Sequence, residues 1–122
     1  MWSLHGKVAV VSGAAQGLGQ ATALAVAEAG ADVVLIDRNL EGAQATAQRI
    51  EAFGRKTLVS NCNVSDPQAI EDLFRTIDSQ FATIDFLGNI AGDGCLARPE
   101  DLSIDDLHRV LQNLVVGRFA MC

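Results

Sequence analysis

The chain has 122 residues, the length of a single domain, and a formal net charge of −6. Hydrophobic residues make up 49% of it and charged residues 20%, an ordinary globular balance. An acidic chain without a basic run is not expected to bind nucleic acid or an anionic membrane surface. No apolar stretch is long enough for a membrane span, and the N-terminal residues contain no signal-peptide core, so we expect a cytoplasmic protein.

The cysteines and histidines do not predict a metal site. Cys62, Cys95 and Cys122 follow no zinc or CxxC spacing, and the two histidines share no ligand spacing. An odd number of cysteines in a cytoplasmic chain predicts free thiols. We expect Cys62 to be a small apolar filler near a strand end and His108 to lie on a solvated helix face.

Short β-branched runs alternate with helical patterns along the chain. The predicted strands are residues 7–12, 32–37, 56–63 and 84–90. The predicted helices are residues 16–30 and 40–53, a third that starts at the Ser-Asp-Pro of 65–67, and a fourth from about Ser103. Four strands, each followed by a helix, predict an α/β fold with a Rossmann-type doubly wound parallel sheet. Right-handed crossovers give the strand order 3-2-1-4.

Three glycines follow the first predicted strand, in the sequence SGAAQGLG. Gly13 comes directly after the strand, and Gly17 and Gly19 open the helix. The N-terminus of a helix has unpaired N–H groups and attracts anions, and glycine lets a phosphate approach the backbone. A tight turn with close strand–helix packing would need the same glycines, so the loop alone leaves both interpretations open.

Asp37 favours the phosphate interpretation. It ends the second predicted strand, at the position where a dinucleotide fold holds the adenosine ribose through a carboxylate. The same carboxylate would repel a 2′-phosphate, which favours NAD over NADP. Arg38 could accommodate that phosphate, and the uncharged Gln16 gives it no help. A solvated strand end is the alternative explanation for Asp37.

Together these residues resemble the N-terminal half of a classical short-chain dehydrogenase/reductase. The family's T-G-x-x-x-G-x-G loop is represented by Ser12 to Gly19, with serine in place of threonine. Its Asp-Val pair after strand three is Asn63-Val64 here, which loses the charge but keeps a carbonyl acceptor. Its Asn-Asn-Ala-Gly sequence after strand four is Asn89-Ile90-Ala91-Gly92. Its helix-four asparagine corresponds to Asn113, with one extra residue before Gly117.

The resemblance implies an NAD-dependent oxidoreductase of alcohol and carbonyl substrates. The implied cofactor-binding residues are Ser12, Gly13, Gln16, Gly17, Leu18, Gly19, Asp37, Arg38, Asn63, Val64, Asn89, Ala91 and Gly92. Asn113 is the one catalytic-group residue that carries over, and in the family its backbone carbonyl holds a water of the proton relay. A packing or helix-kink asparagine is the alternative for this position.

Family members continue to a catalytic serine and a Tyr-x-x-x-Lys motif, whereas this sequence contains no tyrosine. Lys7 and Lys56 are predicted at strand starts, away from a cofactor. We therefore expect residues 1–122 to be a truncated, partial NAD(P)-binding Rossmann domain that is inactive alone. The alternative is a non-catalytic module that binds nucleotide or pairs with a full-length relative. The fourth strand would be an exposed edge, which predicts self-association or pairing with another such chain.

Overall fold

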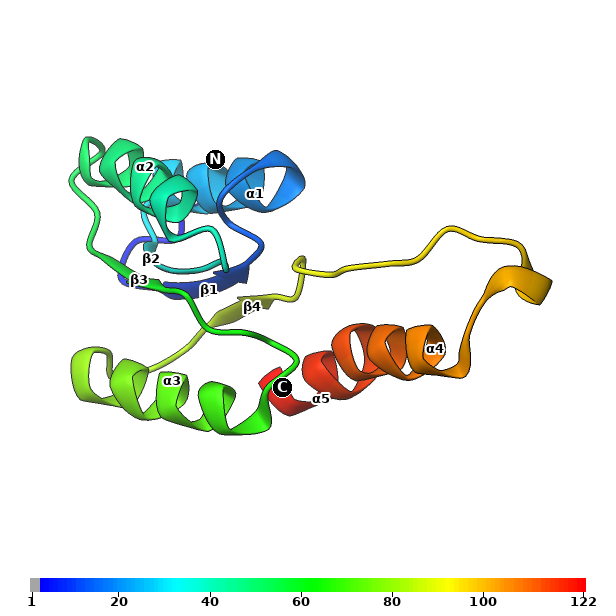
Figure 1. Ribbon diagram of the computed structural model, residues 1–122. Coiled ribbons are helices and arrows are strands. Elements are labelled where there is room, and N and C mark those ends of the chain that lie inside the picture. The colour runs from blue at the N-terminus through cyan, green and yellow to red at the C-terminus, as the bar shows by residue number, and fades with distance from the viewer. Residues whose placement is uncertain (1–2) are drawn as a thin grey trace.

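The computed structural model describes residues 3–122, which form one parallel sheet with helices on both faces (Figure 1). The strand order is β3-β2-β1-β4, which confirms the predicted doubly wound topology. The elements in chain order are β1 (Val8–Ser12), α1 (Gly17–Glu28), β2 (Asp32–Ile36), α2 (Leu40–Glu51), β3 (Thr57–Ser60), α3 (Pro67–Gln80), β4 (Phe86–Gly88), the 3₁₀ helix η1 (Pro99–Asp101), α4 (Ile104–Leu111), the π-helical segment η2 (Gln112–Gly117) and α5 (Arg118–Met121).

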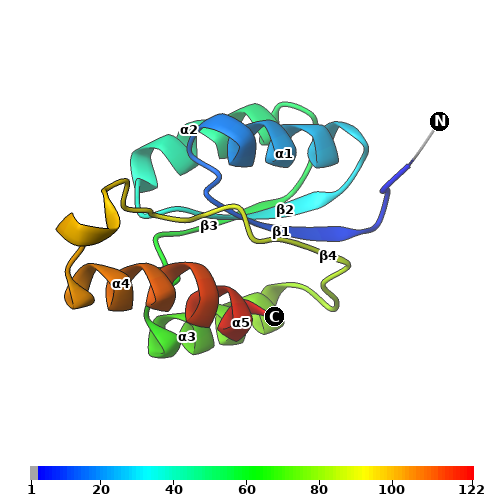
Figure 2. The ribbon, with the colours of Figure 1, turned by 90° about the vertical axis from the view of Figure 1, so that its right-hand side faces the viewer.

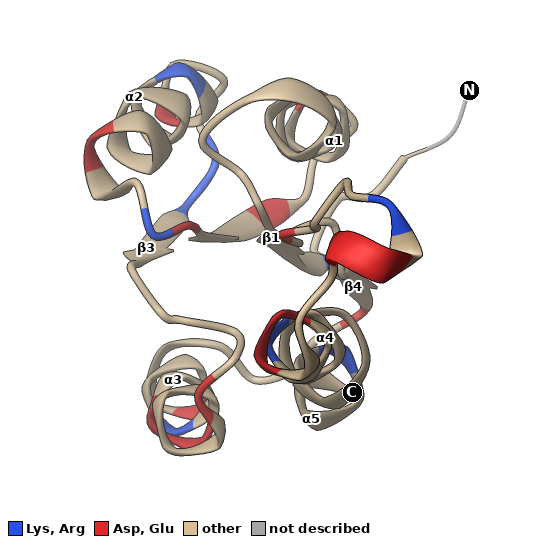
Figure 3. Cartoon of the chain, turned by 45° about the vertical axis from the view of Figure 1, so that its right-hand side comes forward, with Lys and Arg blue, Asp and Glu red and all other residues tan. Residues whose placement is uncertain are grey.

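The central strands bury both faces, so alternate residues belong to different cores. Val33 and Leu35 of β2 pack with apolar residues of α1 and α2. Their neighbours Val34 and Ile36 pack with apolar residues of α3. Figures 2 and 3 show the resulting layers, with α1 and α2 over one face of the sheet and α3, α4 and α5 over the other. β1 and β2 pair in register from Val8–Asp32 to Ser12–Ile36 and form the centre of the molecule.

The two edge strands are shorter than the sequence predicted. β3 ends at Ser60 instead of residue 63, and β4 covers three residues instead of 84–90. Within the described part of the chain, each pairs with a neighbour on one side only, so no second strand there extends its ladder. After β3 the backbone turns: the side-chain oxygen of Asn63 accepts a hydrogen bond of 3.0 Å from the backbone N–H of Ser65. This local bond competes with continued strand pairing.

The fourth predicted helix begins at Ile104, and Ser103 is its N-cap. The sequence did not predict the preceding 3₁₀ helix or the division of the helix into α4, η2 and α5. The π segment ends at Gly117, within the stretch that carries one residue more than the family spacing. A π turn closes i→i+5 hydrogen bonds and takes up one more residue than an α turn. A π turn can therefore accommodate an extra residue inside a continuous helix.

The cysteines are free thiols, with Cys62 buried and Cys95 and Cys122 exposed. His108 is exposed on α4, as predicted. Within residues 3–122, no helix combines the length and apolar character needed to cross a membrane. The same part of the chain contains no cluster of His, Cys, Asp and Glu side chains suited to a metal ion.

Candidate functional site

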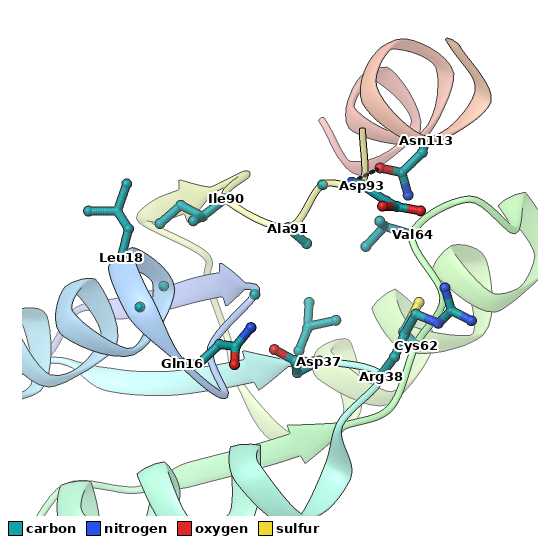
Figure 4. Close-up of a pocket in the computed structure, with 15 residues that line it drawn as sticks. Gln16, Leu18, Asp37, Arg38, Cys62, Val64, Ile90, Ala91, Asp93 and Asn113 are labelled. Carbon is teal, nitrogen blue, oxygen red and sulfur yellow. Dashed lines mark hydrogen bonds between the residues drawn. The ribbon is translucent and has the colours of Figure 1, made fainter. Parts of the chain in front are cut away.

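A cavity of about 360 Å³ lies at the carboxyl end of the sheet, where the segments that follow all four strands meet (Figure 4). Parallel topology brings these segments together, because all four strands end at the same edge. The volume falls within the range of small-molecule sites. The lining residues are Gly13, Gln16, Gly17, Leu18, Gly19, Ile36, Asp37, Arg38, Cys62, Val64, Ile90, Ala91, Gly92, Asp93 and Asn113.

The glycines of the β1–α1 loop have different roles. Gly13 adopts a φ of +73°, a conformation that disfavours side chains. A Cβ on Gly19 would lie 1.9 Å from the carbonyl oxygen of Gly13, so this glycine allows α1 to pack directly on the loop. Gly17 has a φ of +56°, and a Cβ there would meet no other atom within 4 Å. Gly19 therefore serves packing, whereas Gly17 leaves open space at the start of the helix.

The N-terminus of α1 differs from those of the other long helices. Asn39, Asp66 and Ser103 cap α2, α3 and α4 by accepting hydrogen bonds from first-turn N–H groups. Gln16, at the same position of α1, makes no such side-chain bond among the described residues. The first-turn N–H groups of α1 thus remain available to an anion at the cavity.

Asp37 lies beside the glycine loop and is held there by two backbone groups. Its Oδ2 accepts a hydrogen bond of 2.9 Å from the N–H of Ala15, and its Oδ1 accepts one of 2.9 Å from the N–H of Asn39. A carboxylate has about four acceptor positions, so both oxygens can still accept hydroxyl donors. Arg38 is exposed next to it and also lines the cavity.

Ser12 supports the cavity without lining it. Its hydroxyl donates to the carbonyl oxygen of Gly88 (3.2 Å) and accepts from the N–H groups of Ile90 and Ala91 (both 3.0 Å). The side chain is buried, and it bonds to the last residue of β4 and to the segment that follows. Ser12 therefore positions a wall of the cavity.

Asn63 and Asn89, two further predicted cofactor residues, also lie outside the cavity lining. The side-chain oxygen of Asn63 is engaged in its own turn, and the neighbouring Val64 lines the cavity instead. The amide of Asn89 donates to the carbonyl oxygen of Arg118 (3.4 Å) and contacts the sulfur of Cys122 (3.6 Å). Asn89 thus ties β4 to α5.

Four lining residues were not predicted from the sequence: Ile36, Cys62, Ile90 and Asp93. Each lies next to a predicted residue, so adjacency to the matched motifs was the available signal. Burial, with a smaller contribution from the charge of Asp66, raises the pKa of the Cys62 thiol above its ordinary value. At neutral pH this thiol is therefore protonated, which suits a wall residue better than a nucleophile.

The described lysines lie at the starts of strands, as predicted. Lys7 pairs with Asp85 at 3.8 Å, and the ammonium of Lys56 donates to the carbonyl oxygen of Gln80 at 3.0 Å. Neither lines the cavity. The site combines uncapped helix N–H groups, an accepting carboxylate and apolar walls, which is an arrangement for binding a ligand with phosphate and hydroxyl groups.

The parallel sheet of order 3-2-1-4, with a glycine loop at its carboxyl edge, defines a Rossmann-type domain. The sequence matches the family model described as short chain dehydrogenase over residues 7–122, and the chain belongs to that family. It is 38% identical over 119 residues to the D-threitol dehydrogenase of Mycolicibacterium smegmatis, a match that spans 98% of this chain and 46% of that protein.

Two further relatives agree with this assignment. The human (Homo sapiens) 15-hydroxyprostaglandin dehydrogenase [NAD(+)] is 47% identical over 91 residues, which are 73% of this chain and 34% of that protein. The crystal structure of NAD+-bound xylitol dehydrogenase is similar with a TM-score of 0.91 and 34% identity, over 97% of this chain and 46% of that one. The chain thus spans less than half the length of each of these relatives.

Proposed function

We propose that this chain binds the adenosine half of NAD in the cavity at the carboxyl edge of the sheet. The observation that carries the proposal is the position of Asp37 beside the β1–α1 loop, with both carboxylate oxygens able to accept from ribose hydroxyls. The uncapped start of α1 would receive the pyrophosphate. Two relatives, a dehydrogenase named for NAD(+) and an NAD+-bound xylitol dehydrogenase, support the choice of cofactor.

Isothermal titration calorimetry with NAD and NADP tests this proposal. We expect NAD to bind more tightly, because the carboxylate of Asp37 repels a 2′-phosphate. The affinity should be modest, since the proposed contacts hold only the adenosine ribose and the pyrophosphate of the ligand. Binding of NADP equal to or tighter than that of NAD would contradict the proposed specificity, and no heat with either nucleotide would contradict the proposed site.

We further propose that the domain is the N-terminal part of an NAD-dependent oxidoreductase of alcohols or carbonyls. NAD supplies a hydride acceptor in such reactions, and a protein group must take or give the proton. Tyrosine is absent from the 122 residues, and Lys7 and Lys56 lie away from the cavity. The isolated chain should therefore show no NADH formation with a panel of alcohols above the protein-free rate. Turnover that persists through repurification would contradict this.

A second candidate function, that of an interaction module, is favoured by one specific observation. Large apolar side chains of α4, η2 and α5 are exposed, and Figure 3 shows α4 and α5 next to β4. They include Ile104, Leu107, Leu111, Val115, Val116 and Phe119. Such a surface suits association with a second copy or with a longer relative. Size-exclusion chromatography of this chain with and without a full-length family member would show whether it associates with a second copy or with the longer relative.

A further inference from the structure

We infer that the Asn113 side chain is a positioning residue for the cavity: it fastens the β3–α3 loop to the segment that follows β4. This assigns the side-chain amide a role separate from any role of its backbone carbonyl. The inference rests on the proposed dinucleotide binding, because the two fastened segments form the wall opposite the glycine loop (Figure 4).

The amide of Asn113 makes one bond to each segment. Its Oδ1 accepts a hydrogen bond of 2.8 Å from the backbone N–H of Asp93. Its Nδ2 donates one of 2.8 Å to the hydroxyl oxygen of Ser65. Asn113 is 9% exposed, so these bonds form largely out of water. Asn113 lines the cavity itself, together with Asp93 and with Val64 beside Ser65, so the amide joins the two segments within the cavity wall.

Two neighbours on the same helical face contact the same two segments. Arg109 pairs with the carboxylate of Asp93 at 2.6 Å, and the amide of Gln112 donates to the carbonyl oxygen of Ser65 at 3.1 Å. Residues three and four positions apart share one face of a helix, so Arg109, Gln112 and Asn113 act together. Asn113 is the one of the three that bonds to both segments.

The helix can reach the loop because of Gly117. A Cβ on this residue would lie 2.1 Å from the carbonyl oxygen of Val64, so the η2 backbone rests directly against the loop. The π turn that ends at Gly117 accommodates the extra residue of this helix. Asn113 is thereby held at a distance from which its short side chain reaches Ser65.

The segment after β4 depends on such contacts. Residues 89–98 form no regular secondary structure, so side-chain and isolated backbone bonds hold them in place. Ser12 anchors the first part, at Ile90 and Ala91, and Asn113 anchors the next, at Asp93. Loss of the Asn113 amide would leave the Asp93 N–H without its partner and free this part of the wall to move.

Amide hydrogen exchange tests the fastening without any ligand. In Asn113→Ala the backbone amide of Asp93 should exchange at least about ten-fold faster than in the unaltered chain, because its acceptor is gone. His108→Ala, an exposed change on the same helix, is the matched control and should leave that rate unchanged. An unchanged rate in Asn113→Ala, or an equal increase in the control, would overturn the inference.

Calorimetric titration with NAD tests the consequence for the cavity. Asn113→Ala should weaken binding about ten-fold, and Ser65→Ala less, because it removes one of the two bonds. The double variant should bind no more weakly than Asn113→Ala, since both changes break the same link. Asn113→Asp keeps the acceptor for Asp93 and should restore part of the affinity. Additive losses in the double variant would overturn the link through Ser65.

Failure of the proposed function gives a different result from failure of this inference. If the unaltered chain binds no NAD while the Asp93 amide still responds to Asn113→Ala, dinucleotide binding is wrong and the fastening stands. If NAD binds and neither the exchange rate nor the affinity responds to Asn113→Ala, the fastening is wrong. Ser65→Ala removes a single hydroxyl from a half-buried loop residue, so it provides the test should the Asn113 variants fail to fold.

Discussion

Asp37 connects three parts of the site at the scale of a single residue. It directly follows β2, which ends at Ile36, one residue earlier than the sequence predicted. Its carboxylate accepts from the N–H of Ala15 in the glycine loop and from the N–H of Asn39, which in turn caps α2. Its carboxylate is therefore fixed before any ligand arrives, which lowers the entropic cost of binding. The same fixed charge is what should distinguish the two nucleotides.

Asp37→Ala should reduce the preference for NAD over NADP by about ten-fold. Removing the carboxylate abolishes both the ribose acceptors and the repulsion of a 2′-phosphate. Asp37→Asn is the matched control, because it removes the charge and keeps one acceptor oxygen near the loop. It should gain NADP affinity while losing less NAD affinity than the alanine variant. Competition titrations with both nucleotides measure this, and an unchanged preference in Asp37→Ala would show that other residues select the cofactor.

Cys62 should report occupancy of the cavity. Burial raises the pKa of its thiol, and the nearby Asp66 charge adds to the shift, so little thiolate is present at neutral pH. Iodoacetamide should therefore label the exposed Cys95 and Cys122 first, and labelling of Cys62 should accelerate as the pH rises. Saturating NAD should slow the labelling of Cys62 and leave the labelling rates of Cys95 and Cys122 unchanged. Mass spectrometry of the labelled chain measures all three sites; equal rates at Cys62 and Cys95 would contradict the assigned burial.

At the scale of elements, α1 packs on the β1–α1 loop through Gly19, which lies against the carbonyl group of Gly13. Gly19→Ala would put a Cβ within 1.9 Å of the Gly13 carbonyl, against backbone that cannot rotate away. We expect the free energy of unfolding to fall by about 1–3 kcal/mol. Gly94→Ala, where a Cβ meets nothing within 4 Å, should change it by less than about 0.5 kcal/mol. Urea denaturation of both variants measures the difference, and equal stabilities would refute this packing role.

The start of α4 should respond to acid. The hydrogen bond from the Ser103 hydroxyl, followed by that from its backbone N–H, lowers the pKa of Asp106. Ser103 and Asp106 form a capping box, in which each side chain bonds to the backbone N–H of the other residue. Because the pKa of Asp106 is lower in the folded chain, the ionised carboxylate stabilises the helix at pH values above the ordinary carboxyl pKa. This stabilisation is lost as the pH falls through the lowered pKa. NMR titration of the α4 amides should follow this transition below about pH 4. Asp106→Asn should abolish it; a transition that persists in that variant would belong to another group.

The topology and most of the cavity lining followed from the sequence, because glycine loops and strand ends are local signals. The division of the fourth helix did not, since a π turn depends on how Gly117 meets the Val64 carbonyl across the fold. The side-chain orientations of Asn63 and Asn89 could not be predicted from the sequence either. Each amide found a nearby partner, in its own turn or on α5, that motif matching does not reveal.

At the scale of the whole molecule, apolar surface is unevenly distributed. β1 and β2 are almost fully buried, whereas α4 contains no buried residue and Phe119 of α5 is 81% exposed. Among residues 3–122, β4 pairs only with β1, so its other edge has no strand partner there, and Phe86 of β4 is exposed. Edge strands of this kind tend to pair with other chains. In Figure 3, α4 and α5 lie next to β4, so their exposed apolar side chains belong to elements that neighbour this edge of the sheet.

We expect this surface, formed by β4, α4 and α5, to drive concentration-dependent association. Burying a large apolar side chain contributes about 1.5–3 kcal/mol, a substantial part of the roughly 5–15 kcal/mol that stabilises a domain. Phe119→Ser should shift the association to higher protein concentration. Phe53→Ser, an exposed phenylalanine that follows α2, is the matched control and should leave it unchanged. Light scattering across a concentration series measures both variants. A monodisperse monomer at high concentration, with a cooperative thermal transition, would show that the domain needs no partner at this surface.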